Sequence, residues 1–221
     1  ATKSCHSLFS ASRRRRKVGV LTVRTATPAD KSYAVDTVVL TFAADPVARS
    51  CWPDSNWYLA GMPGFILAFG GGACAHNSAH CTEDCSGAAL WLPPNVHPDA
   101  EALGQIVQWT VSASVRGNLS MVFEQMAKYH PNQPHWYMPL IGVDPAHQGK
   151  GCGAAPMAYA LRQCDRNRSL AYWESTNLRN ITLYQRCGFK ALGQIQVGTP
   201  PPVVPILRYS RREPLEWPAH E

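Results

Sequence analysis

Apolar and polar positions along the chain alternate between strand-like and helix-like spacing, which predicts a mixed α/β domain. Residues 18–25 (VGVLTVRT) are rich in β-branched side chains and predict a first strand. Thr27-Pro28 is typical of a helix start, and apolar residues then recur at helical spacing until Asp45-Pro46 breaks the pattern. A second, Trp-rich helix is predicted over residues 55–69 and ends at the glycines of 70–72.

The middle of the chain predicts a hairpin followed by helical structure. Two short strands are expected over residues 73–78 and 87–92, and Pro93-Pro94 closes the second. Residues 99–129 have helical composition, with an interruption expected at Gly117-Asn118.

The last third of the chain alternates strand and helix. Residues 135–143 (HWYMPLIGV) predict a strand, but Pro139 cannot donate a hydrogen bond to a neighbour, so a bulge or an unpaired point is expected there. Gly188 is a suitable left-handed cap for the helix before it. The elements expected here are a helix over 149–165, a strand over 170–174, a helix over 178–187 and two strands over 190–197 and 203–209.

Length and composition suit one domain with a sizeable core, since the chain has 221 residues and 45% hydrophobic content. We expect a disordered basic tail or leader over residues 1–17 and a single domain over residues 18–221. No apolar run reaches the roughly 18 residues that a membrane-spanning helix needs, so no membrane partner is expected.

The formal net charge of +6 belongs to the tail. The first 17 residues hold six Lys and Arg and no acid, while the other 15 basic residues equal the 15 acidic ones in number. The folded part therefore gives no indication of nucleic-acid binding. Eight dispersed Cys favour reduced thiols and a cytoplasmic protein, and organelle import through the Ser- and Arg-rich tail is the alternative.

A local cluster of soft-metal ligands lies in the predicted hairpin: Cys74, His76, His80, Cys81 and Cys85. Their spacing is not that of a standard zinc finger, and strand alternation would put several of them on opposite faces. No metal site is assigned. The alternative is a zinc-stabilised binding module with the basic tail as a nucleic-acid arm.

The glycine-rich segment 148–154 (QGKGCGA) lies between a predicted strand and a predicted helix. Small residues there let backbone N–H groups converge on an anion, and the helix N-terminus adds positive potential, so a phosphate is the expected ligand. A P-loop is excluded, because Asp144 stands where its first glycine is required and Gly151 follows the lysine.

A dinucleotide fingerprint is the stronger alternative for this segment. Gly149, Gly151 and Ala154 satisfy G-x-G-x-x-A. However, residues 144–148 separate the strand from the first glycine, and too little chain follows for the further βα units of a dinucleotide-binding domain.

The segment VDPAHQGKGCGA, residues 143–154, resembles the signature of the GNAT superfamily of N-acetyltransferases, in which Q/R-x-x-G-x-G/A holds the pyrophosphate of coenzyme A. Residues 177–189 are similar to a second family element, N-x(6)-Y-x-x-x-G-F. Together the matches cover about residues 135–190. Residues 89–94 (ALWLPP) and 180–184 are also similar to the subgroup that contains puromycin N-acetyltransferase. The resemblance implies a mixed α/β GNAT-like acyl-CoA N-acyltransferase fold with a splayed central strand.

The resemblance further implies an enzyme that uses acetyl-CoA as co-substrate and acetylates a primary amine of a small molecule by direct attack. Tyr184 is the expected general acid, because a phenol with a pKa of about 10 stays protonated and can supply a proton to the departing thiolate. Glu174 is the candidate base, with a surface ion pair to Arg179 or Lys190 as its alternative role, and His135 is the alternative base. A GNAT-like acyl-CoA sensor or interaction module without turnover is the alternative function, against which the presence of Tyr184 argues.

Three further sets of expectations follow from the resemblance. The backbone of the splayed strand would hold the pantetheine arm, and Asn177 also suits the N-cap of the helix after it. The candidate cofactor-binding residues are Leu140, Ile141, Gly142, Val143, Gln148, Gly149, Lys150, Gly151, Cys152, Gly153, Ala154, Asn177 and Asn180. The candidate substrate-binding residues, an aromatic pocket with one acid for a cationic amine, are Phe42, Asp45, Trp57 and His135. The expected partner is the amine, with no nucleic acid and no membrane, and homodimerisation is left open.

Overall fold

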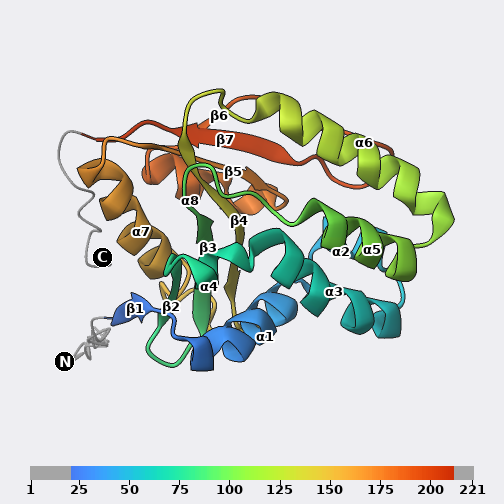
Figure 1. The fold of residues 1–221 in the computed structure, drawn as a ribbon, viewed down its shortest axis with the longest axis horizontal. Coiled ribbons are helices and arrows are strands. Elements are labelled where there is room, and N and C mark those ends of the chain that lie inside the picture. Colours follow the sequence, from blue (N-terminus) through green and yellow to red (C-terminus); the bar gives the residue numbers. More distant parts are fainter. Residues whose placement is uncertain (1–20, 212–221) are drawn as a thin grey trace, which may run out of the picture.

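The computed structural model describes residues 21–211, so the prediction of a disordered tail over residues 1–17 lies outside the described residues. Within this range one mixed sheet runs in the order β1-β2-β3-β4-β5-β7-β6 (Figure 1). Only β4 and β5 pair in parallel, and the other neighbours are antiparallel. The strands of the described residues are β1 (Val23–Thr25), β2 (Ala79–Thr82), β3 (Gly87–Leu92), β4 (His135–Val143), β5 (Leu170–Ser175), β6 (Lys190–Ala191) and β7 (Val204–Arg208). The predicted α/β class is confirmed.

Helices cover both faces of the sheet (Figure 1). One hydrophobic core lies between the sheet and the first helices, and a second lies under α7 and α8. The α-helices are α1 (Lys31–Phe42), α2 (Pro46–Cys51), α3 (Ser55–Gly70), α4 (Gly72–Ala75), α5 (Ala100–Thr110), α6 (Ala113–Tyr129), α7 (Ala154–Arg166) and α8 (Ile181–Arg186). Single turns of 3-10 helix lie at Pro28–Asp30, Pro145–His147 and Leu178–Asn180. None of these described helices is both long enough and apolar enough to cross a membrane.

Strand β3 shows how the sheet separates the two cores. Its six residues are all buried, as expected of a central strand covered on both faces. Leu90 and Leu92 pack into the core of α1 and α3, whereas Ala89 and Trp91 pack into the core of α7 and α8. The period-two alternation of a strand thus distributes one apolar run between two layers.

The irregularity predicted at Pro139 is confirmed. Leu90 pairs with Leu140, but Leu92 pairs with Tyr137, so β4 carries one residue more than β3 across this step. On its other edge, β4 pairs with β5 only as far as Tyr137 opposite Tyr172. Beyond that point the two parallel strands diverge, which leaves the second half of β4 without a partner on the β5 side.

The predicted strand over residues 73–78 is wrong, because the glycines at 70–72 do not end helical structure. Gly71 has right-handed helical angles and links α3 to the single turn of α4. Asn77, with a φ of 53°, then reverses the chain in the left-handed region that asparagine tolerates. The strand that follows is β2, which begins only at Ala79.

The interruption predicted at Gly117-Asn118 lies elsewhere. Helix α5 ends where Val111 turns extended and buries its side chain, and Ser112 is the N-cap residue of α6. Gly117 lies inside α6 on an exposed surface with no atom within 4 Å of a Cβ placed there. A helical glycine costs only about 1 kcal/mol relative to alanine, which tertiary packing readily overcomes.

Two other predicted boundaries are also corrected. The helix expected from residue 149 begins at Ala154, because Gly149 and Gly151 have φ values of 73° and 86° that no right-handed helix contains. The strand expected over residues 190–197 is reduced to the two residues of β6 and one isolated bridge between Ile195 and Val203.

A buried ion pair joins β7 to α7. Arg208 donates from Nη1 and Nη2 to the two carboxylate oxygens of Asp165, each at 2.8 Å, and both side chains are almost fully buried. The Arg208 Nε also donates to the carbonyl of Cys187, and the Arg211 amide donates to Asp165. This pair therefore connects the last strand, the long helix and the end of α8.

Because His80 is buried, we expect the protein to lose stability in mild acid. Its side chain lies in β2 against Tyr159, and burial lowers its pKa to about 4 from an ordinary value of about 6.5. Between these values the unfolded chain binds a proton that the folded chain does not, so the free energy of unfolding falls as the pH falls, by about 3 kcal/mol at pH 4. Urea denaturation at pH 7, 5.5 and 4 should show this loss, and His80→Gln should remove it. Equal pH dependence in the two proteins would contradict the assignment.

Candidate active site

A large pocket of about 1100 Å³ opens where β4 and β5 diverge. Three segments line it: the second half of β4, the glycine-rich loop before α7, and the end of β5 with the start of α8. The last turn of α1 and the start of α2 complete its rim. The bulge at Pro139 and the short β4–β5 pairing thus produce a cavity in the middle of the sheet.

Most of the predicted cofactor-binding residues meet at this pocket. Those that line it are Ile141, Gly142, Val143, Gln148, Gly149, Gly151, Cys152, Gly153, Ala154, Asn177 and Asn180. The two others point elsewhere. Leu140 packs into the core of α1 and α3, because alternate β4 side chains face opposite sides of the sheet, and the Lys150 ammonium donates to the carbonyl of Ala146 at 2.9 Å.

The loop before α7 is folded tightly against the sheet. A Cβ at Gly87 would come within 2.0 Å of the Cys152 carbonyl oxygen, so glycine is needed there for the loop to approach β3. Gly149 and Gly151 use left-handed backbone angles that turn the chain back into the N-terminus of α7. A helix N-terminus preceded by such a turn is a favourable site for a phosphate.

Tyr184 lies at the inner wall of the pocket. It is 5% exposed, and its ring contacts Trp173 edge to face at a centroid distance of 4.1 Å. Burial raises the pKa of this phenol, and hydrogen bonding with Asn180 and Ser175 offsets part of the increase. The hydroxyl therefore stays protonated at neutral pH and is suited to donate a proton rather than accept one. Asn177 caps the turn before α8, where its side chain accepts from the Arg179 amide at 3.0 Å.

Glu174 does not lie in a surface ion pair. Its side chain is 3% exposed, and its Oε2 accepts a hydrogen bond from the Tyr137 hydroxyl at 2.9 Å. Its Oε1 lies 3.3 Å from Nε2 of His130 but accepts no hydrogen bond of good geometry among the described residues. A buried carboxylate oxygen without a donor is costly, which makes this atom the natural acceptor for a proton or a ligand N–H.

The rings around Glu174 are linked to it and to one another by hydrogen bonds and close contacts. Burial and the nearby carboxylate raise the pKa values of Tyr137 and Tyr172, so both phenols are neutral donors. His135 Nδ1 lies 2.8 Å from the Gln133 carbonyl, to which it can only donate, and His135 Nε2 lies 3.3 Å from Nδ1 of His130. Burial lowers the pKa of His135, so near neutral pH its Nε2 carries a lone pair that orients His130 Nδ1 as a donor. The other ring nitrogen of His130, Nε2, faces Oε1 of Glu174 at 3.3 Å.

Sequence reasoning missed both partners of Glu174. Tyr137 could have been found, because β4 and β5 were both predicted and parallel strands place alternate residues of each on one face. His130 had no such signal. It follows the end of α6, and its approach to β5 depends on how that helix packs.

The predicted substrate residues lie in different places. Phe42 and Asp45 line the large pocket, and Asp45 caps α2 while its second oxygen accepts from the Thr176 hydroxyl at 2.7 Å. Trp57 is 55% exposed on α3 and lines neither of the two pockets described here. His135 lines neither pocket, but it contacts His130, which lines the second.

The Cys and His cluster of the predicted hairpin is dispersed over α4, β2 and the turn after β2. Cys81 and Cys85 have Sγ atoms 3.3 Å apart, and His76 lies on the exposed end of α4. Over residues 21–211, no three His, Cys, Asp or Glu side chains are grouped in a way that could hold a metal ion.

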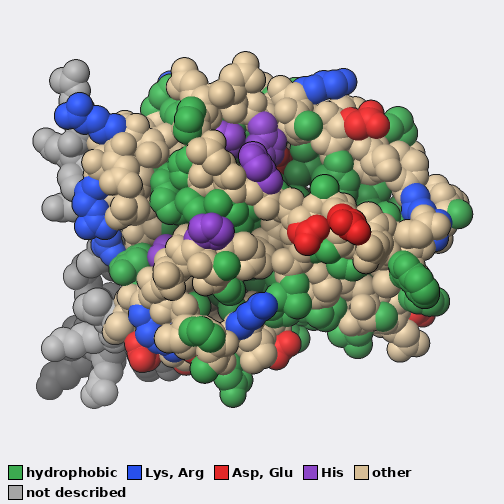
Figure 2. Space-filling model, in the orientation of Figure 1, with side chains coloured by type: hydrophobic (Ala, Val, Ile, Leu, Met, Phe, Trp, Pro, Cys, Tyr) green, Lys and Arg blue, Asp and Glu red, His purple; other side chains and the backbone are tan. Residues whose placement is uncertain are grey.

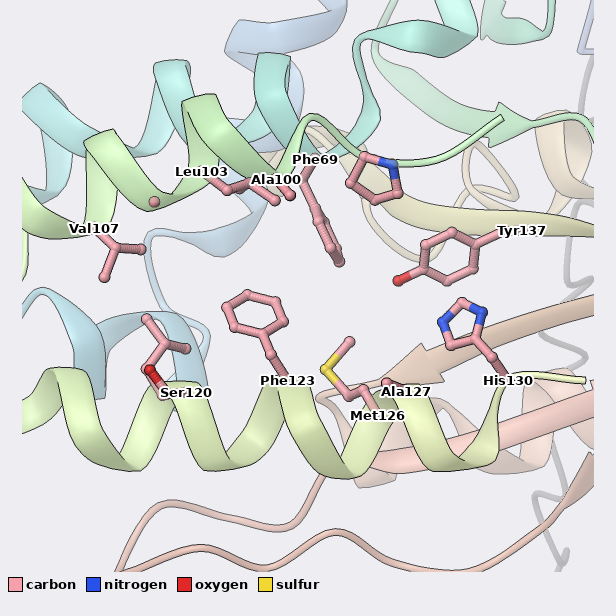
Figure 3. Close-up of a pocket in the computed structure, with 13 residues that line it drawn as sticks. Phe69, Ala100, Leu103, Val107, Ser120, Phe123, Met126, Ala127, His130 and Tyr137 are labelled. Carbon is pink, nitrogen blue, oxygen red and sulfur yellow. The ribbon is translucent and has the colours of Figure 1, made fainter. Parts of the chain in front are cut away.

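A second pocket of about 490 Å³ lies between α5 and α6. Leu103 and Val107 of α5 face Phe123 and Met126 of α6 across it, and Tyr137 and His130 stand at one end (Figure 3). On the surface, hydrophobic side chains form the floor of a hollow that is bordered by histidine side chains (Figure 2). Glu174 contacts both residues at that end and also lines the large pocket, so one carboxylate stands between the two cavities.

Known structures share this fold. A Corynebacterium glutamicum protein described as histone acetyltransferase HPA2 and related acetyltransferase is 24% identical with a TM-score of 0.62, over 88% of this chain and 99% of that one. A Drosophila melanogaster polyamine N-acetyltransferase is 12% identical with a TM-score of 0.59, over 86% and 99% of the two chains. Arylalkylamine N-acetyltransferase 2 from Aedes aegypti is 15% identical with a TM-score of 0.58, over 85% and 97%.

Sequence comparison identifies the segment that carries the site. Residues 121–189 match the acetyltransferase (GNAT) family, and they include β4, the glycine-rich loop, Glu174 and Tyr184. The predicted GNAT-like fold is confirmed, while the finer resemblance to the puromycin N-acetyltransferase subgroup stays a prediction. Residues 121–189 are thus similar in sequence to the acetyltransferase (GNAT) family, and the described chain as a whole shares the fold of known acetyltransferases.

Proposed function

We propose that the enzyme transfers the acetyl group of acetyl-CoA to a primary amine of a small molecule by direct attack. The observation that supports this most directly is the pocket between β4 and β5, which joins a phosphate-suited loop to a buried acid and a buried base. The diphosphate would lie on the loop and the N-terminus of α7. The pantetheine arm would follow the unpaired half of β4, whose backbone N–H groups are not used by β5.

Direct attack requires a neutral amine, a polarised carbonyl and a leaving thiolate that finds a proton. We assign deprotonation of the amine to Glu174, whose Oε1 accepts the ammonium proton directly or through Nε2 of His130. The amine nitrogen then forms the new bond to the acetyl carbon, and backbone N–H groups of β4 stabilise the negative charge that develops on the oxygen. When the carbon–sulfur bond breaks, the Tyr184 hydroxyl donates its proton to the sulfur, and the surplus proton on the new amide nitrogen returns to the Tyr184 phenolate, so that the products are a neutral amide and a neutral thiol.

The proposal is tested by release of the coenzyme A thiol from acetyl-CoA in the presence of a panel of amines. Tyr184→Phe should lower kcat by about 10²-fold while leaving the KM for acetyl-CoA nearly unchanged, because the ring still packs on Trp173. Tyr159→Phe is the matched control, since Tyr159 lies on α7 against His80 and lines neither pocket. Tight coenzyme A binding without turnover of any amine would instead favour the acyl-CoA sensor.

A further inference from the structure

The connection between β3 and β4 is far longer than the sheet requires. Antiparallel neighbours can be joined by a turn of two residues, yet residues 93–134 separate these strands and form α5 and α6. Neither helix has a fully buried residue, although α5 in particular is strongly amphipathic. Their apolar faces are turned toward each other and are only partly covered. The two helices therefore pack on the core with part of their apolar faces and enclose space with the rest.

The enclosed space has the size and lining of a small-molecule site. Pockets for small ligands typically measure about 300–1000 Å³ and are mostly apolar with a few polar groups. The pocket here measures about 490 Å³, and its walls include Leu103, Val107, Phe123 and Met126. No Asp, Glu, Lys or Arg is among the described residues that line it. A ligand with charges along its length would lose solvation there without gaining a partner.

Two of the three polar side chains among the described residues that line the pocket lie at the end that approaches the cofactor site, and the third, Ser120, lies on α6 away from it. Tyr137 and His130 stand at that end (Figure 3), and both contact Glu174 behind them. The Oε1 atom of Glu174 is buried and has no hydrogen bond of good geometry among the described residues, although the Tyr172 phenol also interacts with this carboxylate. An ammonium group placed at this end would meet the Tyr137 hydroxyl and His130 with the Glu174 carboxylate directly behind them, and the rest of the molecule would lie between the apolar faces of two helices.

We propose that the pocket between α5 and α6 holds the body of the acceptor, which is a monoamine with an apolar alkyl or aromatic tail. This inference rests on the proposed acetyl transfer and adds to it the class of the acceptor. A polyamine is disfavoured because its second ammonium would lie among apolar side chains, and an amino acid is disfavoured because the lining offers no cation for its carboxylate.

The first measurement compares linear n-alkylamines from propylamine to heptylamine. We expect kcat/KM to rise about three- to fourfold for each methylene until the pocket is filled, since each one leaves water for an apolar wall. A diamine of matching length should be a poorer substrate than the monoamine. A flat response to chain length, or a preference for the diamine, would overturn the inference.

The second measurement fills the pocket with a side chain. Gly104 lies on α5, lines the pocket and has no atom within 4 Å of a Cβ placed there, so Gly104→Phe extends a ring into open space. We expect the ratio of kcat/KM for hexylamine to that for propylamine to fall at least tenfold. Gly117→Phe is the matched control, because Gly117 is an equally open, exposed helical glycine of α6 that does not line the pocket. Its ratio should equal that of the unaltered enzyme.

Ser120→Phe blocks the same space from α6 and serves if Gly104→Phe does not fold. Direct binding of hexylamine by calorimetry separates this inference from the acetyl-transfer proposal. Binding that Gly104→Phe abolishes, without turnover of any amine, would support the pocket and refute acetyl transfer. Turnover with a selectivity ratio that neither phenylalanine substitution changes would support acetyl transfer and refute the pocket.

Discussion

Glu174→Gln is expected to lower kcat for amine acetylation by about 10²–10⁴-fold, the range measured for loss of a general base. The amide keeps the size of the carboxylate and can still accept the Tyr137 hydroxyl, but it cannot take a proton from the attacking ammonium. The measurement is steady-state thiol release, together with calorimetric binding of acetyl-CoA. Binding should change little, because the predicted contacts of the cofactor are with the loop and β4.

The pH profile separates a base from a structural residue in this variant. An alkylamine loses its own proton in solution as the pH approaches its pKa, so the variant should recover part of its rate at high pH, whereas the unaltered enzyme gains less. Glu101→Gln provides the control, since Glu101 is an exposed residue in the first turn of α5 and lines neither pocket. A loss of rate that is the same at every pH would show that Glu174 positions other groups and is not the base.

Asp165→Ala should lower the free energy of unfolding by about 3–5 kcal/mol, because it leaves the fully buried Arg208 guanidinium without its carboxylate. Urea denaturation of the two proteins at pH 7 measures the difference. The double variant Asp165→Leu with Arg208→Met should be less destabilised than Asp165→Ala, since apolar side chains of similar volume often replace a buried ion pair at little cost. A loss below about 1 kcal/mol for Asp165→Ala would mean that water or another group reaches the guanidinium.

The parts of the site that the sequence predicted are those set by the local backbone. Proline cannot donate a hydrogen bond at any position in a strand, so the bulge in β4 could be predicted from Pro139 alone. The loop over residues 148–154 was predicted because glycines between a strand and a helix let backbone N–H groups converge on an anion. Tyr184 was identified only through its resemblance to a family element, since an aromatic residue on an amphipathic helix is usually core.

The parts that were not predicted depend on contacts between distant segments. The buried position of Glu174 results from α6 placing His130 beside β5, more than forty residues later in the chain. The pocket between α5 and α6 could not be foreseen while their boundary was placed at Gly117-Asn118, because that division would not produce two facing helices. The break at Val111 is set by burial of that side chain, which no local rule reveals.

The connection between β3 and β4, residues 93–134, has a consequence for how the sequence of this protein can change in evolution. Its two ends are adjacent, since Leu92 pairs with Tyr137, and its helices contribute no fully buried side chain. Changes on the exposed faces of α5 and α6 would therefore leave the sheet and the coenzyme-binding half intact, whereas Val111 is buried in the core and His130 contacts Glu174. On the proposed function, the lining of the pocket between α5 and α6 can change to fit new acceptors while the glycine-rich loop, Glu174 and Tyr184 stay as they are.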